Sequence, residues 1–256
     1  MRKRLKDVCI LVIVCIGLFA YMCNENTPQT NYIIASTIMR TDTYENSHAL
    51  AYLQYGDSVL VKQKFGTYAK IEKNDEVGYV QTTYLKNEKP NPICKEDGFV
   101  YTIVVNIVNE QLAKIDNTIL DKFETDGFSI YATEEDLSKR VKNTKKEEHV
   151  LGLTSYKTSR ILIGNSVHDA YDSTLHELGH WIDYDFDFTS DSKLFQWIYE
   201  KEKKQFEKTF DYTITDASEL FADGFLHYID DAKMLKETCP CLYYYLNTVY
   251  FMEKTF

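Results

Sequence analysis

The 256-residue sequence lacks an excess of positive charge. Its 29 lysines and arginines face 39 aspartates and glutamates, which gives a formal net charge of −10. Nucleic acids are bound mainly through clustered basic residues, and no basic stretch rich in aromatics is present. The sequence therefore argues against a nucleic-acid partner, and its length suits one or two globular domains.

Cysteine pairs with the two-residue gap of zinc and redox sites are also missing. Three of the six cysteines lie before residue 24, which leaves Cys94, Cys239 and Cys241. Three thiols cannot all pair within one chain, and Cys239 and Cys241 are separated by a single proline. We expect structural cysteines, or at most one disulfide that includes Cys94.

The apolar run at residues 8–23 falls short of the ~20 residues of a typical membrane span. It follows a basic stretch, Met1–Lys6, as in a secretory signal, but an Ala-x-Ala cleavage site is absent. Cys23 also lacks the small preceding residue usual at a lipidated cysteine. Residues 1–23 are thus predicted to be a signal peptide or an uncleaved anchor with its basic end inside, followed by a polar tether over 24–30. Either alternative predicts an extracellular protein, secreted or anchored to the outer face of the membrane.

Residues 31–86 show short alternating apolar runs separated by turn residues, which predicts a small all-β barrel. Five strands are expected, at 33–40, 49–54, 59–64, 68–72 and 78–81. The motifs Tyr55-Gly-Asp57, Gly66-Thr-Tyr-Ala-Lys-Ile71 and Gly78-Tyr-Val80 resemble those of bacterial SH3-like domains. That resemblance implies attachment to a cell-wall ligand or another partner, although Thr67 stands where these domains usually carry tryptophan. Residues 87–94, with two prolines, are predicted to form a stiff linker.

Residues 95–256 are predicted to form an α+β domain whose C-terminal part is helical. The expected strands are 100–107, 128–132, 150–156 and 160–164. The expected helices are 108–123, 192–206, 216–228 and 240–253, the last with Pro240 in its first turn.

A catalytic pattern lies within this domain, at Leu175-His-Glu-Leu-Gly-His180. On a helix, His176 and His180 lie on one face and can bind the same Zn²⁺ ion. Glu177, beside the first histidine, can take a proton from the attacking water, as in a metalloprotease. A chance occurrence of the pattern is the alternative interpretation.

A catalytic zinc requires a third protein ligand. The position where metzincins have a third histidine is Phe186 here, so that pattern is excluded. Glu219 is the better candidate, on a predicted helix that also places Asp223 one turn later, where it can support His176. The alternative for Glu219 is a capping box with Asp216. One zinc per chain is predicted.

The combination His176-Glu-Leu-Gly-His-Trp-Ile-Asp183, Tyr212 and Glu219-Leu-Phe-Ala-Asp223 resembles the anthrax lethal factor catalytic domain family, which includes the secreted Pro-Pro endopeptidases. The resemblance covers about residues 95–256 and implies a zincin-type metallopeptidase acting on a protein or peptide. It implies His176, His180 and Glu219 as zinc ligands and Glu177 as the base. It also implies that Tyr212 is an active-site tyrosine rather than a core residue, and Asp223 stands where lethal factor has glutamate.

The stretch Leu151-Gly152-Leu153 is predicted to form a strand edge that pairs with an extended substrate. Gly152 would let the two backbones approach closely, and proline at Leu151 or Leu153 would remove an edge donor. The alternative is an internal strand with a bulge at Gly152.

These patterns together predict an exported zinc-dependent endopeptidase. The alternatives are a cell-wall-binding protein and a hydrolase of peptidoglycan cross-links.

Overall fold

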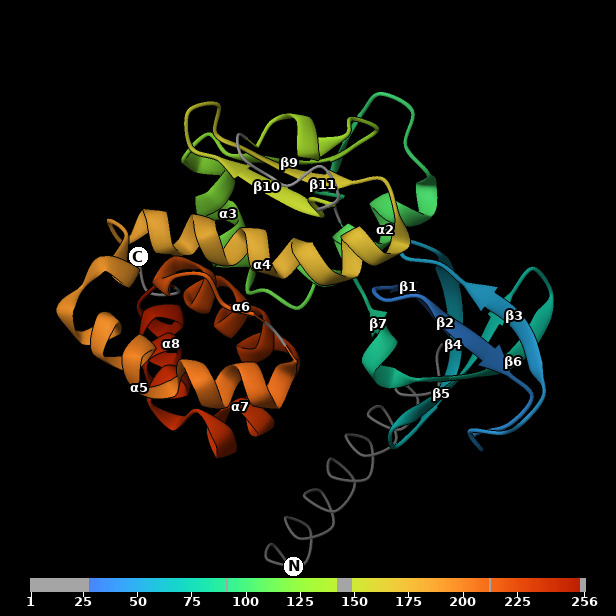
Figure 1. Ribbon diagram of the computed structural model, residues 1–256. Helices are drawn as coiled ribbons and strands as arrows, with labels where there is room; N and C mark the ends of the chain where they lie inside the picture. The colour runs from blue at the N-terminus through green and yellow to red at the C-terminus, as the bar shows by residue number, and fades with distance from the viewer. Residues whose placement is uncertain (1–27, 91, 142–148, 212, 254–256) are drawn as a thin grey trace, which may run out of the picture. The chain divides into compact units, whose positions relative to one another are not determined.

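The computed structural model describes residues 28–90, 92–141, 149–211 and 213–253, and the chain divides into two compact units, Met1–Asn91 and Pro92–Phe256 (Figure 1). The division falls inside the expected linker, 87–94. The predicted signal or anchor segment, 1–23, and most of the tether lie outside the described residues. Within the described ranges, no helix combines the length and apolar character needed to cross a membrane.

The first unit is built on one seven-stranded sheet in the order β3-β2-β6-β5-β4-β1-β7, with antiparallel pairs throughout. Its strands are β1 (Gln29–Ile33), β2 (Thr37–Arg40), β3 (Ala49–Leu53), β4 (Ser58–Phe65), β5 (Tyr68–Lys73), β6 (Glu76–Gln81) and β7 (Leu85–Lys86), with a 3-10 turn at Thr82–Tyr84.

Alternation of apolar and polar residues explains this sheet. Val59 and Val61 of β4 and Ala69 and Ile71 of β5 are buried, whereas residues between them are more exposed. They form part of one core with Ile33, Met39, Leu53 and Val80. Because successive side chains of a strand point to opposite faces, the alternation places one face of the sheet inward.

The structure corrects two expectations for this unit. The first predicted strand, 33–40, is interrupted at 34–36, and the sheet begins at Gln29, inside the expected tether. Among the described strands, β3 and β7 end the order and do not pair with each other, so the sheet is open rather than the expected closed barrel. Closure would need hydrogen bonds between these edges, and β7 has only two residues.

The second unit has a four-stranded sheet in the order β10-β11-β9-β8. It consists of β8 (Lys95–Asp97), β9 (Ser129–Thr133), β10 (Gly152–Ser155) and β11 (Arg160–Gly164). The pairs β8–β9 and β9–β11 are parallel, whereas β10 is antiparallel to β11 and forms the edge.

Helices pack on this sheet and on one another. They are α2 (Thr102–Leu112), α3 (Asn117–Thr125), α4 (Val167–Asp185), α5 (Lys193–Phe210), α6 (Ala217–Asp230), α7 (Ala232–Thr238) and α8 (Pro240–Glu253), with 3-10 turns at Leu137–Lys139 and Thr189–Asp191. Figure 1 shows α4 lying between the sheet and the helices α6 and α8. Its contacts with β10, β11, α2 and α6 make it the central element of an α+β unit, as predicted.

The predicted strand 100–107 is wrong, because that stretch begins α2. The apolar run was ambiguous between strand and helix. Val104, Ile107, Val108 and Leu112 recur at helical spacing and are buried, and α2 packs against α4. Tertiary burial of this face favours a helix despite the β-branched residues. The predicted long helix is also divided, with Asp116 capping α3 through the Thr118 N–H.

The three cysteines of the second unit are free thiols. Cys94 and Cys239 are buried, and Cys241 is half-buried. Burial raises the pKa of Cys94 to about 12 and that of Cys239 to about 11. The structural role was the prediction, and the alternative disulfide with Cys94 is not formed in the described structure.

Candidate metal centre

Both histidines of the catalytic pattern lie on α4. Ser166 caps this helix by accepting a hydrogen bond from the Asp169 N–H (3.0 Å). One face of α4 is buried through Leu175, Leu178 and Trp181 among others. The helical spacing of four residues leaves His176 and His180 together on another face, with their Nε2 atoms 3.1 Å apart.

Glu219 reaches these histidines from the first turn of α6. Its Oε2 lies 3.4 Å from His176 Nε2, and its Oε1 lies 3.5 Å from His180 Nε2. Asp216 caps α6 by accepting the Glu219 N–H at 3.1 Å. The capping bond expected as the alternative role of Glu219 therefore uses its backbone N–H. The Glu219 side chain remains available and faces the histidines.

Gly179 allows α4 and α6 to approach closely. A Cβ atom at this position would lie 2.9 Å from Ala222 Cα and 3.1 Å from the Ala222 carbonyl oxygen. Backbone atoms cannot move aside as the end of a side chain can. The glycine inside the catalytic pattern thus brings the helix that carries Glu219 next to the helix that carries the histidines.

The three side chains fit a zinc ion. One ligand atom from each of His176, His180 and Glu219 lies within 4.8 Å of the others. Zinc bonds of roughly 2.0–2.2 Å at tetrahedral angles place neighbouring ligand atoms roughly 3.3–3.5 Å apart. The separations of 3.1, 3.4 and 3.5 Å are close to these edges. Two imidazoles and one carboxylate also form a donor set typical of catalytic zinc.

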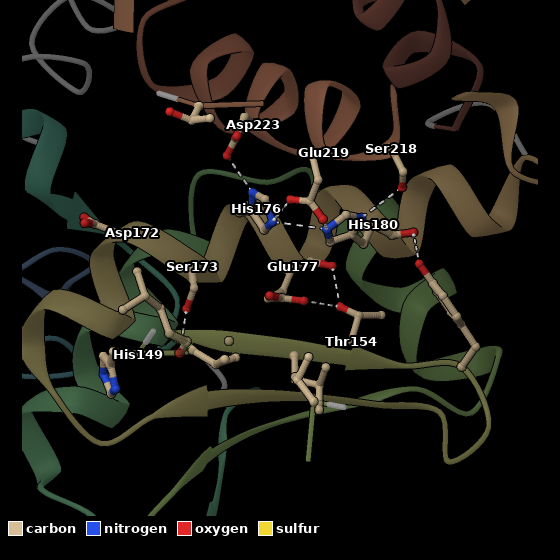
Figure 2. Close-up of a pocket in the computed structure, with 17 residues that line it drawn as sticks. His149, Thr154, Asp172, Ser173, His176, Glu177, His180, Ser218, Glu219 and Asp223 are labelled. Carbon is tan, nitrogen blue, oxygen red and sulfur yellow. Dashed lines mark hydrogen bonds and ion pairs between the residues drawn. The ribbon is translucent and has the colours of Figure 1, made fainter. Parts of the chain in front are cut away.

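Asp223, which was predicted to support His176, contacts that histidine. Its Oδ1 lies 2.6 Å from His176 Nδ1, and this contact directs Nε2 of the ring toward Glu219 and His180 (Figure 2). Burial alone would lower the pKa of His176, but hydrogen bonds to Asp223 and Glu219 outweigh burial and raise it to about 10. Contacts with the two histidines hold the pKa of Glu219 far below its ordinary value.

His180 has a different partner, which the sequence analysis missed. Its Nδ1 lies 3.3 Å from Ser218 Oγ, and Ser218 in turn donates to Asp183 at 3.2 Å. Asp183 is fully buried and also accepts the N–H and hydroxyl of Ser190. Burial raises the pKa of Asp183, whereas these hydrogen bonds oppose the rise. Only two features of the sequence could have indicated this link. Ser218 stands beside Glu219, and Asp183 follows His180 by one helical turn.

Glu177 is held by strand β10. Thr154 Oγ1 lies 2.6 Å from Glu177 Oε2 and 3.0 Å from the Glu177 carbonyl oxygen. Gly152 faces the same side chain, since a Cβ at Gly152 would lie 2.7 Å from Glu177 Cγ and 2.9 Å from Ser173 Cβ. We expected this glycine to make room for a substrate backbone. The structure shows that it makes room for Glu177, and its role toward a substrate backbone stays a prediction.

A cavity of about 800 Å³ joins these groups. His176, Glu177, His180 and Glu219 line it together with the predicted substrate strand, Leu151, Gly152 and Leu153. Figure 2 shows Glu177 between the strand that carries Thr154 and the histidines, with His149 to the left of them. The strand and the ligand cluster therefore share one cavity.

The strand β10 is an edge strand, not the internal bulged strand that was the alternative. The Gly164 N–H donates to the Leu151 carbonyl (2.8 Å), and Leu153 pairs with Leu162. Because hydrogen bonding alternates along antiparallel strands, Leu151 and Leu153 direct their backbone groups to β11. The outward groups belong to Gly152 and Thr154, so the expectation that proline at either leucine removes an edge donor is wrong.

Tyr212 lies outside the described residues. Another tyrosine, Tyr156, lines the cavity and donates its hydroxyl to the His180 carbonyl at 3.3 Å. Burial raises the pKa of Tyr156 well above its ordinary value. The Tyr156 ring is held in place by stacking on the Tyr184 ring, with the two ring centroids 4.7 Å apart.

The protein family described as anthrax toxin lethal factor, N- and C-terminal domain, matches residues 80–249, more than half of the chain. Among solved structures, the PRO-PRO endopeptidase (PPEP-2) from Paenibacillus alvei is similar, with 18% sequence identity and a TM-score of 0.51. The likeness covers 61% of this chain and 97% of that chain, and at this identity it shows a shared fold. No curated protein matches the chain.

Proposed function

The chain belongs to the anthrax toxin lethal factor family, and from that premise we propose that it is a zinc-dependent endopeptidase. The observation that carries the proposal is the cluster of His176, His180 and Glu219 with Glu177 in the same cavity. The solved structure with the same fold is named as an endopeptidase, which agrees with a peptide substrate.

In this proposal His176, His180 and Glu219 hold one Zn²⁺ per chain. When bound, zinc supplies Lewis-acid polarisation of the scissile carbonyl and makes water nucleophilic near neutral pH. Asp223 keeps the proton of His176 on Nδ1, which leaves Nε2 free to ligate.

Glu177 acts as the general base. It accepts the proton of the attacking water and delivers it to the leaving amine. The hydroxyl of Thr154 fixes one carboxylate oxygen, Oε2, and leaves Oε1 as the second acceptor. Tyr212, by family resemblance, donates a hydrogen bond to the developing oxyanion.

The substrate lies along β10 as an added strand. Its backbone exchanges hydrogen bonds with Gly152 and Thr154, whose N–H and C=O groups face the open edge. The side chains of Leu151 and Leu153, which line the cavity, contribute to selectivity.

We further propose that the protein is exported, because a basic stretch precedes an apolar run within residues 1–23. The remainder is then extracellular, either secreted or anchored to the outer face of the membrane. The first unit acts as an SH3-like module that binds a cell-wall ligand.

A library of linear peptides tests the enzymatic proposal. The purified wild-type protein should cut peptides internally, and Glu177→Gln should reduce turnover by a factor of about 10²–10⁴, because it removes the base. Zinc content should be unchanged in this variant, since all three ligands remain. Full turnover by Glu177→Gln would overturn the role of Glu177.

Purified cell wall serves as the second substrate. Release of peptidoglycan fragments without cleavage of any linear peptide would favour the cross-link hydrolase. Binding to the wall with neither activity would favour a cell-wall-binding protein.

A further inference from the structure

Ser218 lies between His180 and a buried carboxylate. Its Oγ is 3.3 Å from His180 Nδ1 and 3.2 Å from Asp183 Oδ2, and Figure 2 shows its hydroxyl directed at the His180 ring. Asp183 has no exposed surface. Two further hydrogen bonds reach it from Ser190, from the N–H to Oδ1 at 2.7 Å and from the hydroxyl to Oδ2 at 2.6 Å.

The protons in this network can be assigned by counting donors. The Ser190 N–H can only donate, so Asp183 Oδ1 is an acceptor. An ionised carboxylate accepts at both oxygens, so Ser218 gives its single hydroxyl proton to Oδ2. The Ser218 oxygen can then only accept from the histidine, which places the His180 proton on Nδ1.

We propose that Asp183, acting through Ser218, is a positioning residue that fixes the tautomer of His180. This inference rests on the proposed function, in which His180 Nε2 is a zinc ligand. With the proton held on Nδ1, Nε2 keeps its lone pair and faces His176 Nε2 at 3.1 Å and Glu219 Oε1 at 3.5 Å.

The two histidines are therefore supported in different ways. His176 contacts Asp223 directly at 2.6 Å, whereas the carboxylate that serves His180 acts through a hydroxyl. Ser218 directly precedes Glu219, so one turn of α6 supplies both the third ligand and the support of the second.

The turn after α4 secures Asp183 in its place. Asp187 and Phe188 adopt left-handed backbone angles, with φ of 56° and 54°. Such angles are unfavourable for residues other than glycine and persist where the surroundings hold them. The two hydrogen bonds between Ser190 and Asp183 provide that restraint, and Gln196 also donates to the Ser190 carbonyl at 3.0 Å.

Asp183→Asn tests the proposal because it reverses one hydrogen bond. The Ser190 N–H requires an acceptor, so the amide oxygen takes the place of Oδ1 and the NH₂ group faces Ser218. Ser190 and Ser218 then both accept from the amide NH₂, which frees the Ser218 hydroxyl proton for donation to His180 Nδ1. The His180 proton moves to Nε2, where it blocks a zinc ligand.

We expect zinc affinity, measured by competition with a chelator, to fall by roughly 10- to 100-fold in this variant. Long-range ¹H–¹⁵N NMR of the metal-free full-length protein should show His180 protonated at Nδ1 in the wild type and at Nε2 in Asp183→Asn. Wild-type zinc affinity in the variant, or an unchanged Nδ1 proton, would overturn the proposal.

Asp185→Asn is the matched control. It removes the same charge two residues later on α4, where the carboxylate pairs with Lys122 rather than with the centre. Zinc affinity and the His180 tautomer should stay at wild-type values in this control.

Ser218 provides an independent pair of variants should Asp183→Asn fail to fold. Ser218→Ala should weaken zinc binding, and Ser218→Thr, which keeps the hydroxyl, should restore it. Equal zinc affinity in the alanine and threonine variants would contradict the relay. The NMR measurement distinguishes this inference from the proposed function. If the wild-type protein cuts no peptide but carries the His180 proton on Nδ1, only the proposed function is contradicted.

Discussion

Thr154 is the residue outside α4 that contacts Glu177 through a short side-chain hydrogen bond of 2.6 Å. In the proposed mechanism this carboxylate accepts a proton from water and has to be aimed, because a side chain with three free torsions samples many directions. Gly152 has no side chain and so leaves space for Glu177 against β10, and the Thr154 hydroxyl fixes the carboxylate in that space.

Thr154→Val should lower kcat and leave KM and zinc content unchanged. Hydrogen bonds to charged groups contribute about 1.5–3 kcal/mol, which corresponds to a loss of roughly 10- to 160-fold. Steady-state kinetics on a cleaved peptide would measure this loss. Thr154→Ser should keep most of the activity, because the hydroxyl remains.

Thr158→Val is the control for a lost hydroxyl in the same hairpin. Among the described residues the Thr158 hydroxyl bonds only to Ser155 Oγ, at the exposed turn, so removing this hydroxyl should leave kcat unchanged. A loss in kcat that was as large in Thr158→Val as in Thr154→Val would point to a general weakening of the hairpin instead.

At the scale of elements, the centre depends on how closely α4 and α6 pack. Gly179 is the contact point, with Ala222 on the opposite helix. Small residues at such crossings let two backbones approach, and a larger residue forces the helices apart. The distance between Glu219 and the two histidines depends directly on this approach.

Gly179→Ala should therefore destabilise the protein by about 1–3 kcal/mol and weaken zinc binding, because its methyl group overlaps the Ala222 backbone. Denaturant unfolding and chelator competition would measure the two effects. Gly224→Ala is the matched control, since its Cβ would meet the flexible side-chain ends of Leu242 and Leu246 at 3.0 Å or more and no backbone atom nearer than these. Equal effects of the two substitutions would contradict the role of the helix crossing.

The exposed edge of β10 leads to a second prediction, which concerns how a peptide substrate pairs with this strand. A peptide that adds to an antiparallel edge uses the backbone groups of every second residue. N-methylation of a cleaved peptide, one amide at a time, should reduce turnover at alternate positions near the cleaved bond and leave the intervening positions active. The unmethylated peptide is the reference. Equal losses at successive positions would argue against strand addition.

At the scale of the whole molecule, the residues of the centre all lie in the second unit. That unit, Pro92–Phe256, has its own core, which includes Trp181, Phe195 and Phe221, and its own sheet. The first unit has a separate core. Compact units with separate cores commonly fold independently.

A fragment of residues 92–256 should therefore fold, bind one zinc and cleave peptides with the kcat/KM of the full chain. Circular dichroism, metal analysis and kinetics would check the three properties. A fragment that is folded and loaded with zinc but inactive would show that the first unit completes the cleft.

Several features were predictable because they depend on neighbouring residues. Strand β11 and helix α8 have the bounds that the sequence predicted, Arg160–Gly164 and Pro240–Glu253. A short β-branched run after a turn and a proline at the first helical position are local signals. The strand predicted at 100–107 was wrong because the apolar run there is compatible with both a strand and a helix. Packing against α4 favours the helix.

Local sequence alone was enough to predict which side chains of α4 meet at the centre. His176, Glu177 and His180 lie within one helix, and their spacing alone puts the two imidazoles on a common face. The tertiary structure decided the rest. It determined that the Glu219 side chain faces the histidines, that Gly152 makes room for Glu177, and that Ser218 links His180 to Asp183. Such contacts join residues that are far apart in the chain, so they depend on how helices and strands pack and not on the pattern within any one of them.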